Sequence, residues 1–213
     1  MRAIRTDIRE VFIIEPEIFT DERGYFFESY NEDDFTKQVR FQVFKQDNES
    51  YSRYGVVRGL HYQYPLGQSK LVRVMKGKIL DVAVDIRKGS PTFGKHVAVE
   101  LTAENHRQLF VPSSFAHGFS VLSPDAIVLY KCNHTYDPKA ERAIAWNDPD
   151  LGIDWKIPAA DVILSEKDKH HPRLKDVKCL FDYFTGRDLA RLDWEIQRAV
   201  ARMEKKPPRL QKS

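Results

Sequence analysis

Apolar and polar residues alternate over much of the segment from Tyr51 to about Trp146, which predicts short strands separated by turns. The clearest strand is KILDVAVDI at 78–86, where every second residue is apolar and Asp81 and Asp85 fall on the other face. KLVRVM at 70–75 precedes it, and Lys76–Gly77 between the two is typical of a tight hairpin turn. Further strands are expected at 96–101, 108–112, 115–122 and 126–132. This spacing favours a β-sandwich or barrel over strands that alternate with long helices.

Helical patterns occur only near the two ends of the chain. Residues 31–39 predict one short helix with Asn31 as its N-cap. Residues 186–204 form an amphipathic pattern, and Thr185 with Asp188 makes a capping box in front of it. Its apolar stripe consists of Leu189, Leu192, Ile196, Val200 and Met203. The last residues form a basic tail that we expect to be frayed.

Composition excludes several classes of protein. With 213 residues, of which 42% are hydrophobic and 12% aromatic, the chain can form a core and is not disordered as a whole. A net charge of +3 is too balanced for a dedicated nucleic-acid binder. No apolar run approaches the ~18 residues of a membrane-spanning helix. The two cysteines, Cys132 and Cys179, are too few for a disulfide framework, so we expect a cytoplasmic protein. From the charge and the apolar runs, we expect neither nucleic-acid nor membrane partners.

The densest group of chemically useful residues is GVVRGLHYQYPLGQSK at 55–70. Arg58 and His61 would face opposite sides of a regular strand, but a bend at Gly59 could bring them together, close to Lys70. A histidine with a carboxylate partner is a standard general base, and a lysine can stabilise an enolate oxygen. From spacing alone, however, a lone histidine in a β-protein is more often structural.

Three residues further along the chain could complete such a site: His117 in FAHGF, Tyr130 in IVLYK and Asp168 in LSEKD. Tyr130 could deliver a proton opposite the base, although a tyrosine on an apolar strand more often only packs. The histidines do not have the spacing of metal ligands, since no H-x-H pair occurs and His170 and His171, on an extended chain, would point apart. We therefore expect no metal.

Together, the motifs closely resemble the dTDP-4-dehydrorhamnose 3,5-epimerase family. They are DERGYFFESYN (21–31), QDNESYSRYGVVRGLHYQ (46–63), KLVRV (70–74), DVAVDIRKGSPTFGK (81–95), LTAENHRQLFVPSSFAHGFSVLS (101–123), YK (130–131), WNDPDLGIDW (146–155) and LSEKD (164–168). The resemblance implies a mainly β, cupin-like jelly roll over 1–184, with short helices at the chain ends, that acts as a homodimer without metal or organic cofactor. It leaves 185–213 as an extension.

The resemblance also implies a reaction, the inversion of C5 and C3 of dTDP-4-dehydro-6-deoxy-D-glucose to give dTDP-4-dehydro-L-rhamnose. It makes His61 the general base with Asp168 as its partner, and Tyr130 the acid on the opposite face of the sugar. Lys70 would hold the C4 oxygen, and His117 would line the sugar pocket. The nucleotide site maps to Arg23, Phe26, Glu28, Gln46, Asn48 and Arg58. In the family, part of this site is completed by the partner subunit.

Two alternatives remain open at this point. One is an epimerase that acts at a single carbon, or on another nucleotide-linked 4-keto sugar, because pocket shape decides how often the base and acid act. The other is a non-catalytic jelly-roll module that binds a nucleotide sugar. The joint presence of His61, Lys70, Tyr130 and Asp168 argues against the second alternative.

Overall fold

The computed structural model describes residues 1–178 and 180–183. The chain divides into two units, Met1–Phe181 and Asp182–Ser213, and of the second only the first two residues are described. The predicted helix at 186–204, its capping pair, the basic tail and Cys179 lie outside the described residues. Within the described ranges, no helix is long and apolar enough to cross a membrane.

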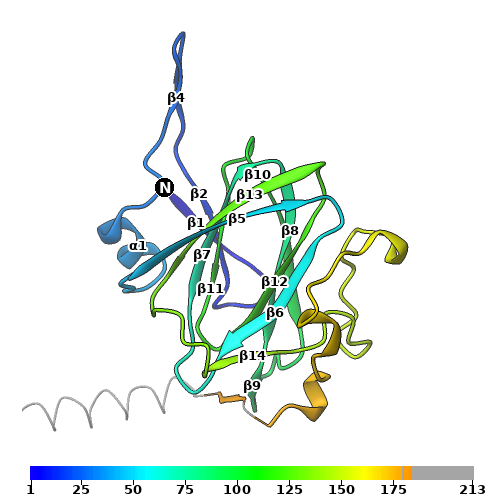
Figure 1. Cartoon of the computed structure of the whole chain (residues 1–213). Helices are drawn as coiled ribbons and strands as arrows, with labels where there is room; N and C mark the ends of the chain where they lie inside the picture. Colours follow the sequence, from blue (N-terminus) through cyan, green and yellow to red (C-terminus); the bar gives the residue numbers. More distant parts are fainter. Residues whose placement is uncertain (179, 184–213) are drawn as a thin grey trace, which may run out of the picture. The chain divides into compact units, whose positions relative to one another are not determined.

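The first unit is a jelly-roll sandwich of two antiparallel sheets, as predicted (Figure 1). The six-stranded sheet has the order β1 (Arg2–Arg5), β2 (Phe12–Glu15), β11 (Gln108–Val111), β7 (Lys70–Lys76), β13 (Asp125–Cys132) and β5 (Gln46–Arg53). The five-stranded sheet has the order β10 (His96–Thr102), β8 (Lys78–Asp85), β12 (Phe115–Val121), β6 (Val57–Gln63) and β14 (Glu141–Ala143). The predicted strands between 70 and 132 are all confirmed.

The remaining elements are short. A hairpin of β3 (Phe19–Asp21) and β4 (Gly24–Phe26) projects from the sandwich, and β9 (Arg87–Lys88) pairs with β15 (Phe181–Asp182) (Figure 1). Among the residues that the structure describes, the single α-helix is α1 (Glu32–Gln38), and three 3-10 turns follow β14: η1 (Ala159–Asp161), η2 (Asp168–His170) and η3 (Leu174–Asp176). None of the strands before Tyr51 was predicted, because they are short or rich in polar residues.

Helix α1 confirms the prediction for 31–39. The Asn31 side chain accepts a hydrogen bond from the Asp34 backbone N–H at 3.1 Å, which satisfies one of the free donors of the first turn. Phe35 is fully buried and packs edge-on against Phe110 of β11, with ring centroids 5.2 Å apart. The helix therefore covers an outer patch of the six-stranded sheet.

Both faces of β8 are buried, whereas the sequence predicted only one face in the core. Ile79 and Ala83 pack in the interior between the sheets. Leu80 and Val82 point the other way and pack against Trp155 and other residues of the segment that follows β14. This segment covers the outer face of the sheet (Figure 1). A strand covered on both sides must bury its polar residues too, so Asp81 and Asp85 are both fully buried.

The predicted hairpin at Lys76–Gly77 is wrong. The chain does turn there, with Gly77 at φ +77°, but β7 and β8 enter different sheets and do not pair. A side chain at Gly77 would approach the Asp125 carbonyl oxygen to 2.1 Å. A Lys-Gly pair is thus also found in a turn that connects strands of two different sheets. The local sequence does not distinguish such a turn from a hairpin.

A bend at Gly59 in β6 is confirmed. Gly59 has φ +125°, and the pairing of β6 with β12 shifts register between His117 and Phe119, which indicates a β-bulge. A Cβ at Gly59 would lie 2.5 Å from the Gly118 Cα. The two strands thus approach too closely for any side chain at this position, and His61 lies two residues after the bend.

We expect Gly59→Ala to lower the free energy of unfolding by about 3 kcal/mol or more, because it adds backbone strain to a backbone clash. Gly89→Ala is the matched control. Gly89 has φ +80° but open space around it, so only the strain of about 1 kcal/mol should appear. Urea denaturation at one fixed protein concentration measures both. Equal losses in the two variants would contradict the close approach.

Candidate active site

A cavity of about 240 Å³ lies between the edges of the two sheets and collects five of the predicted site residues. These are Gln46, Asn48, His61, Lys70 and Tyr130. His61 comes from β6 of the five-stranded sheet, while Lys70 and Tyr130 come from β7 and β13 of the six-stranded sheet. The cavity is therefore lined with polar groups from both sheets.

Strand β5 contributes to this cavity through the alternation of its side chains. Gln46 and Asn48 are half-buried, whereas Asp47 and Glu49 between and after them are exposed. The Gln46 amide donates to the Asn48 side-chain oxygen at 2.8 Å, which holds both groups at the cavity wall. The negative charge of Glu49 consequently points away from the cavity.

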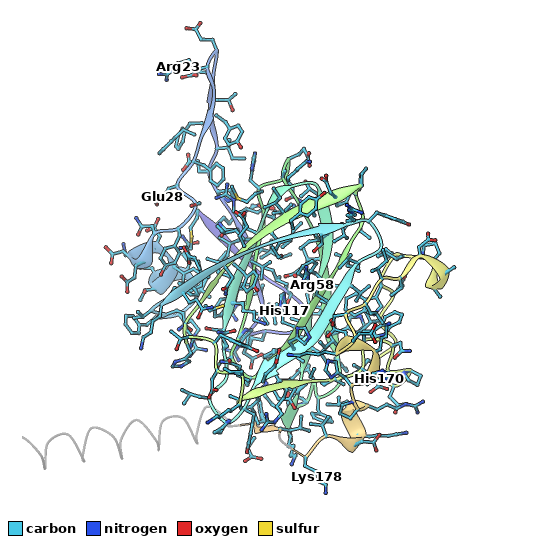
Figure 2. The ribbon with its side chains drawn as sticks, viewed as in Figure 1. Arg23, Glu28, Arg58, His117, His170 and Lys178 are labelled. Atoms are coloured by element: carbon cyan, nitrogen blue, oxygen red, sulfur yellow. The ribbon has the colours of Figure 1, made fainter. Side chains whose placement is uncertain are left out.

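The predicted site residues fall into a central group within the sandwich and a distant group on or beside the projecting hairpin. Figure 2 shows Arg58 and His117 among the strands of the sandwich, while Arg23 lies near the tip of the projecting hairpin and Glu28 at its base. Phe26 of the same hairpin is 70% exposed. Within one chain, the structure does not bring these three hairpin-region residues to the cavity that contains His61.

His61 and Asp168 form a close pair. The Nε2 atom of His61 lies 2.6 Å from Oδ1 of Asp168, which is itself buried on η2. The Ser165 hydroxyl donates to the other carboxylate oxygen at 2.9 Å and accepts from the Asp168 backbone N–H. This pair orients the imidazole and leaves its Nδ1 atom as the nitrogen that could accept a proton from a ligand.

The environment keeps Asp168 ionised. Burial alone raises the pKa of its carboxyl group, but the hydrogen bonds from His61, Ser165 and His171 outweigh burial and hold the pKa below its ordinary value. A carboxylate beside the imidazole stabilises the imidazolium that forms when His61 takes up a proton.

A second buried chain of groups ends at Lys70. Its Nζ atom lies 3.4 Å from Nδ1 of His117, whose Nε2 lies 2.8 Å from Oδ1 of Asp81. Burial lowers the pKa of both Lys70 and His117, while the negative charge of Asp81 acts in the opposite direction on both. The resemblance implied that His117 lines the sugar pocket, but His117 is not among the residues that line this cavity and stands behind Lys70 instead. It supports the lysine.

Tyr130 faces the cavity from β13, directly opposite Asn48 in the pairing with β5. Burial is the main cause that raises the pKa of its phenol, so the hydroxyl keeps its proton at neutral pH. Tyr130 and His61 therefore offer a proton donor and a proton acceptor to one cavity from two different sheets.

Arg58 and His61 do reach one place, as the bend at Gly59 predicted. Both line a neighbouring cavity of about 260 Å³, together with Asp168. The Arg58 Nε donates to the Ser52 hydroxyl at 3.0 Å and its Nη2 to the Tyr51 carbonyl at 3.4 Å, and Arg58 is an exposed residue. This leaves a cation with a planar set of donors beside the site, which suits phosphate oxygens.

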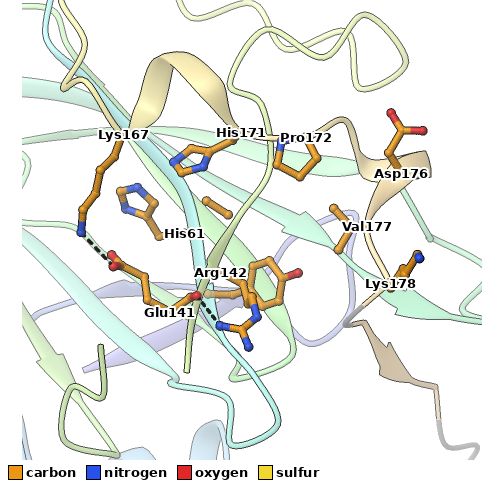
Figure 3. A pocket seen from close by; sticks show the side chains of 11 residues that line it. His61, Glu141, Arg142, Lys167, His171, Pro172, Asp176, Val177 and Lys178 are labelled. Atoms are coloured by element: carbon orange, nitrogen blue, oxygen red, sulfur yellow. Dashed lines mark hydrogen bonds and ion pairs between the residues drawn. The ribbon is translucent and has the colours of Figure 1, made fainter. Parts of the chain in front are cut away.

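Several residues of the site were not found from the sequence. Glu141 lines the cavity, accepts from the Tyr136 hydroxyl at 3.0 Å and pairs with Lys167 at 3.2 Å. His171 lies beside His61 (Figure 3), and its Nε2 is 3.2 Å from Oδ1 of Asp168. The only signal for Glu141 was its place shortly before the WNDP motif. His171 was missed because the adjacent-histidine argument assumed an extended chain, whereas η2 turns here.

Comparison with known proteins gives one consistent result. Residues 5–176 match the dTDP-4-dehydrorhamnose 3,5-epimerase family. Proteins of that name from Pseudomonas aeruginosa and Methanothermobacter thermautotrophicus are 51% and 50% identical over 180 and 176 residues. These alignments cover 84% and 82% of this chain, and 99% and 95% of the relatives.

A solved structure is similar as well. It is the crystal structure of dTDP-6-deoxy-D-glucose-3,5-epimerase from Legionella pneumophila in complex with dTDP-4-keto-L-rhamnose. The TM-score is 0.84 at 46% identity, and the match covers 86% of this chain and 99% of that one.

The pair of Asp168 with its donors predicts a pH-dependent effect on stability. Because its pKa is lowered by folding, Asp168 contributes stability above its ordinary value of 3.8, and this contribution is lost as the pH falls below that value. We expect Asp168→Asn to have a free energy of unfolding about 1–3 kcal/mol lower than the wild type at pH 7, because its hydrogen bonds no longer have a charged acceptor.

The two proteins should converge as the pH falls from 3.8 through the lowered pKa that Asp168 has in the folded protein. Urea denaturation at a series of pH values measures this difference. Asp7→Asn, at an exposed aspartate, is the control and should differ little from the wild type at any pH. A difference for Asp168→Asn that stays constant across the series would show that the carboxylate charge is not what stabilises the pair.

Proposed function

The chain belongs to the dTDP-4-dehydrorhamnose 3,5-epimerase family, and from this membership we propose which of its residues perform the epimerisation and how. The substrate is dTDP-4-dehydro-6-deoxy-D-glucose and the product dTDP-4-dehydro-L-rhamnose, the 4-keto precursor of dTDP-L-rhamnose. One observation carries the mechanism: a paired histidine and a protonated tyrosine face the same cavity from opposite sheets.

The first chemical step is removal of the proton at C5. His61 takes this proton on Nδ1, the ring nitrogen that does not face Asp168. The electron pair of the C–H bond moves to the C4 oxygen and gives an enolate, so the step needs a positive group at that oxygen. Lys70, held by His117 and Asp81 in a buried chain, supplies that charge and donates a hydrogen bond.

Inversion requires that the proton return on the other face of the sugar. Tyr130 donates its phenolic proton to C5, the enolate collapses to the ketone, and exchange with solvent restores both groups. The same steps at C3 complete the double inversion. No step in this sequence needs a metal or an organic cofactor, because the 4-keto group already acidifies both C–H bonds.

Nucleotide binding uses a different set of contacts. Arg58 suits the diphosphate, and Gln46 and Asn48 line the wall beside it. Arg23, Phe26 and Glu28 reach the site of a partner subunit in a homodimer. The projecting hairpin supports this part of the proposal, since Phe19, Tyr25 and Phe26 are all exposed on it, and a group of exposed apolar side chains marks an interaction surface.

The domain assignment follows the same residues. Every group used in this mechanism lies before position 172, which supports 1–184 as the cupin-like catalytic domain and 185–213 as an extension. The protein works in the cytoplasm, where its buried thiol at Cys132 stays reduced.

The reaction is tested by incubation with dTDP-4-dehydro-6-deoxy-D-glucose in deuterated water, followed by mass spectrometry and proton NMR. We expect deuterium at both C3 and C5 and an L-rhamnose product after a reductase is added. His61→Ala should lower exchange at both carbons by 10² or more, of the order of a general base's contribution. Binding of dTDP should remain within a few-fold, since its contacts lie elsewhere.

Other labelling results would select the alternatives. Label at one carbon would make the protein a single-site epimerase. A folded wild type that binds dTDP but incorporates no label would be a binding module or act on another sugar. Undiminished exchange in His61→Ala would refute the assigned base.

Tyr130→Phe should separate exchange from inversion. Without the phenolic proton, His61 can still remove the C5 proton and return deuterium to the same face, so exchange should persist. Inverted product should fall about 10²-fold or more, of the order of a general acid's contribution. Tyr51→Phe, at an exposed tyrosine on β5, is the control and should form product at the wild-type rate. Unchanged product formation by Tyr130→Phe would exclude this tyrosine as the acid.

A further inference from the structure

The His61–Asp168 pair has a third member that the epimerase mechanism does not use. His171 directs its Nε2 toward the same carboxylate oxygen of Asp168 that His61 contacts. The two imidazole rings stand edge-on to each other, with centroids 5.9 Å apart (Figure 3). Two imidazole nitrogens and one carboxylate oxygen thus converge on one small region.

The distances in this cluster suit a transition-metal ion. The three potential ligand atoms all lie within 4.8 Å of one another, with contacts of 2.6 Å and 3.2 Å to the shared oxygen. Around a tetrahedral Zn²⁺ with bonds of about 2.0–2.1 Å, ligand atoms stand about 3.3 Å apart. Small rotations of the side chains would therefore bring all three into the coordination sphere. Nitrogen and oxygen donors of this kind are those that Zn²⁺ prefers.

The surroundings of the cluster also meet the needs of a metal site. The Ser165 hydroxyl holds the second oxygen of Asp168 at 2.9 Å, so the carboxylate is oriented before an ion arrives. His61 and His171 both line a cavity of about 410 Å³, which provides an entry path and room for a water in the fourth position. Lys167, the neighbouring cation on the chain, is paired with Glu141 at 3.2 Å.

We propose that His61, Asp168 and His171 form a binding site for a zinc-like divalent metal ion, and that its occupation switches the epimerase off. The inhibitory part rests on the proposed role of His61 as the base. The site itself rests on the three convergent ligand atoms and stands independently of the reaction.

The chemistry of the imidazole explains why the ion would inhibit. A neutral imidazole carries one proton, which in the free enzyme sits on Nε2 and is donated to Asp168. A metal bound at Nε2 displaces this proton, and the ring then carries its single proton on Nδ1. A nitrogen that already holds a proton cannot remove one from the sugar, so the metal-bound enzyme has lost its base.

The first test measures binding without any reference to activity. The full chain, stripped of metals with EDTA, is titrated with Co²⁺ as a spectroscopic substitute for Zn²⁺. We expect visible absorption bands of a cobalt ion with low coordination number that saturate at one ion per subunit and disappear when Zn²⁺ is added. His171→Ala should remove these bands, and so should Asp168→Asn.

The second test measures epimerisation against Zn²⁺ concentration, each variant being referred to its own metal-free rate. The wild type should be inhibited, with full recovery in excess EDTA. His171→Ala should raise the concentration for half-inhibition more than about tenfold, because loss of even an outer partner of a metal site costs 10- to 100-fold in affinity. His170→Ala is the matched control: this neighbouring histidine is exposed, and the variant should match the wild type in both tests.

The outcomes separate the two parts of the inference. Cobalt bands and zinc inhibition that are the same in His171→Ala as in the wild type would overturn the site. Cobalt bands that depend on His171, with no loss of epimerisation, would establish the site but refute His61 as the base. In that case the proposed mechanism would fail and the metal site would not.

Discussion

The site depends on carboxylates that are buried yet charged. Asp168 and Asp85 each have several hydrogen-bond partners, whereas Asp81 has one on Oδ1 and none on the buried Oδ2 within the described residues. Each carboxylate thereby fixes its partner in place. Asp81 holds His117, and Asp168 holds His61. Asp85 uses the same principle for the fold: the Arg87 guanidinium and the hydroxyls of two neighbouring residues bind it at 2.6–2.9 Å. The contacts that stabilise each buried carboxylate are thus the same contacts that position its partner residue.

The segment after β14 contributes both to the packing of the fold and to the candidate active site. It covers the outer face of the five-stranded sheet through Trp155 and Leu174, and the Asp148 carboxylate fixes its path by accepting from the Leu174 backbone N–H at 2.7 Å. The same segment carries Asp168 to His61. A substitution that loosens this cover would therefore disturb the orientation of the imidazole even without touching the cavity.

Much of the fold was predictable because alternation of apolar residues is a local property. The strands between 70 and 132 follow from it directly, and the helix at 31–39 was predicted with Asn31 as its N-cap, which is a local signal as well. The partner of each strand does not, which is why the turn at Gly77 was misread as a hairpin. For the site, the family motifs singled out His61, Lys70 and Tyr130, and these do meet in one cavity.

What the motifs could not provide were contacts between distant segments in space. Glu141 and His171 belong to the site only because β14 and η2 fold back against β6. In the sequence, the only signal for Glu141 is its place shortly before the WNDP motif, which does not indicate a contact with β6. Likewise, the placement of His117 behind Lys70 depends on the pairing of β12 with β6 and β8, which no pattern along one strand reveals.

The long separation in sequence between the two members of the His61–Asp168 pair has a consequence for how the protein folds. His61 and Asp168 are 107 residues apart, so closing this loop is entropically costly and must wait for the sandwich beneath it. During synthesis, the strands of the sandwich through β13 leave the ribosome well before Asp168 does. With the proposed role of Asp168, regain of epimerase activity in a refolding experiment would report the docking of the segment that carries Asp168, and would lag behind any signal from the interior core.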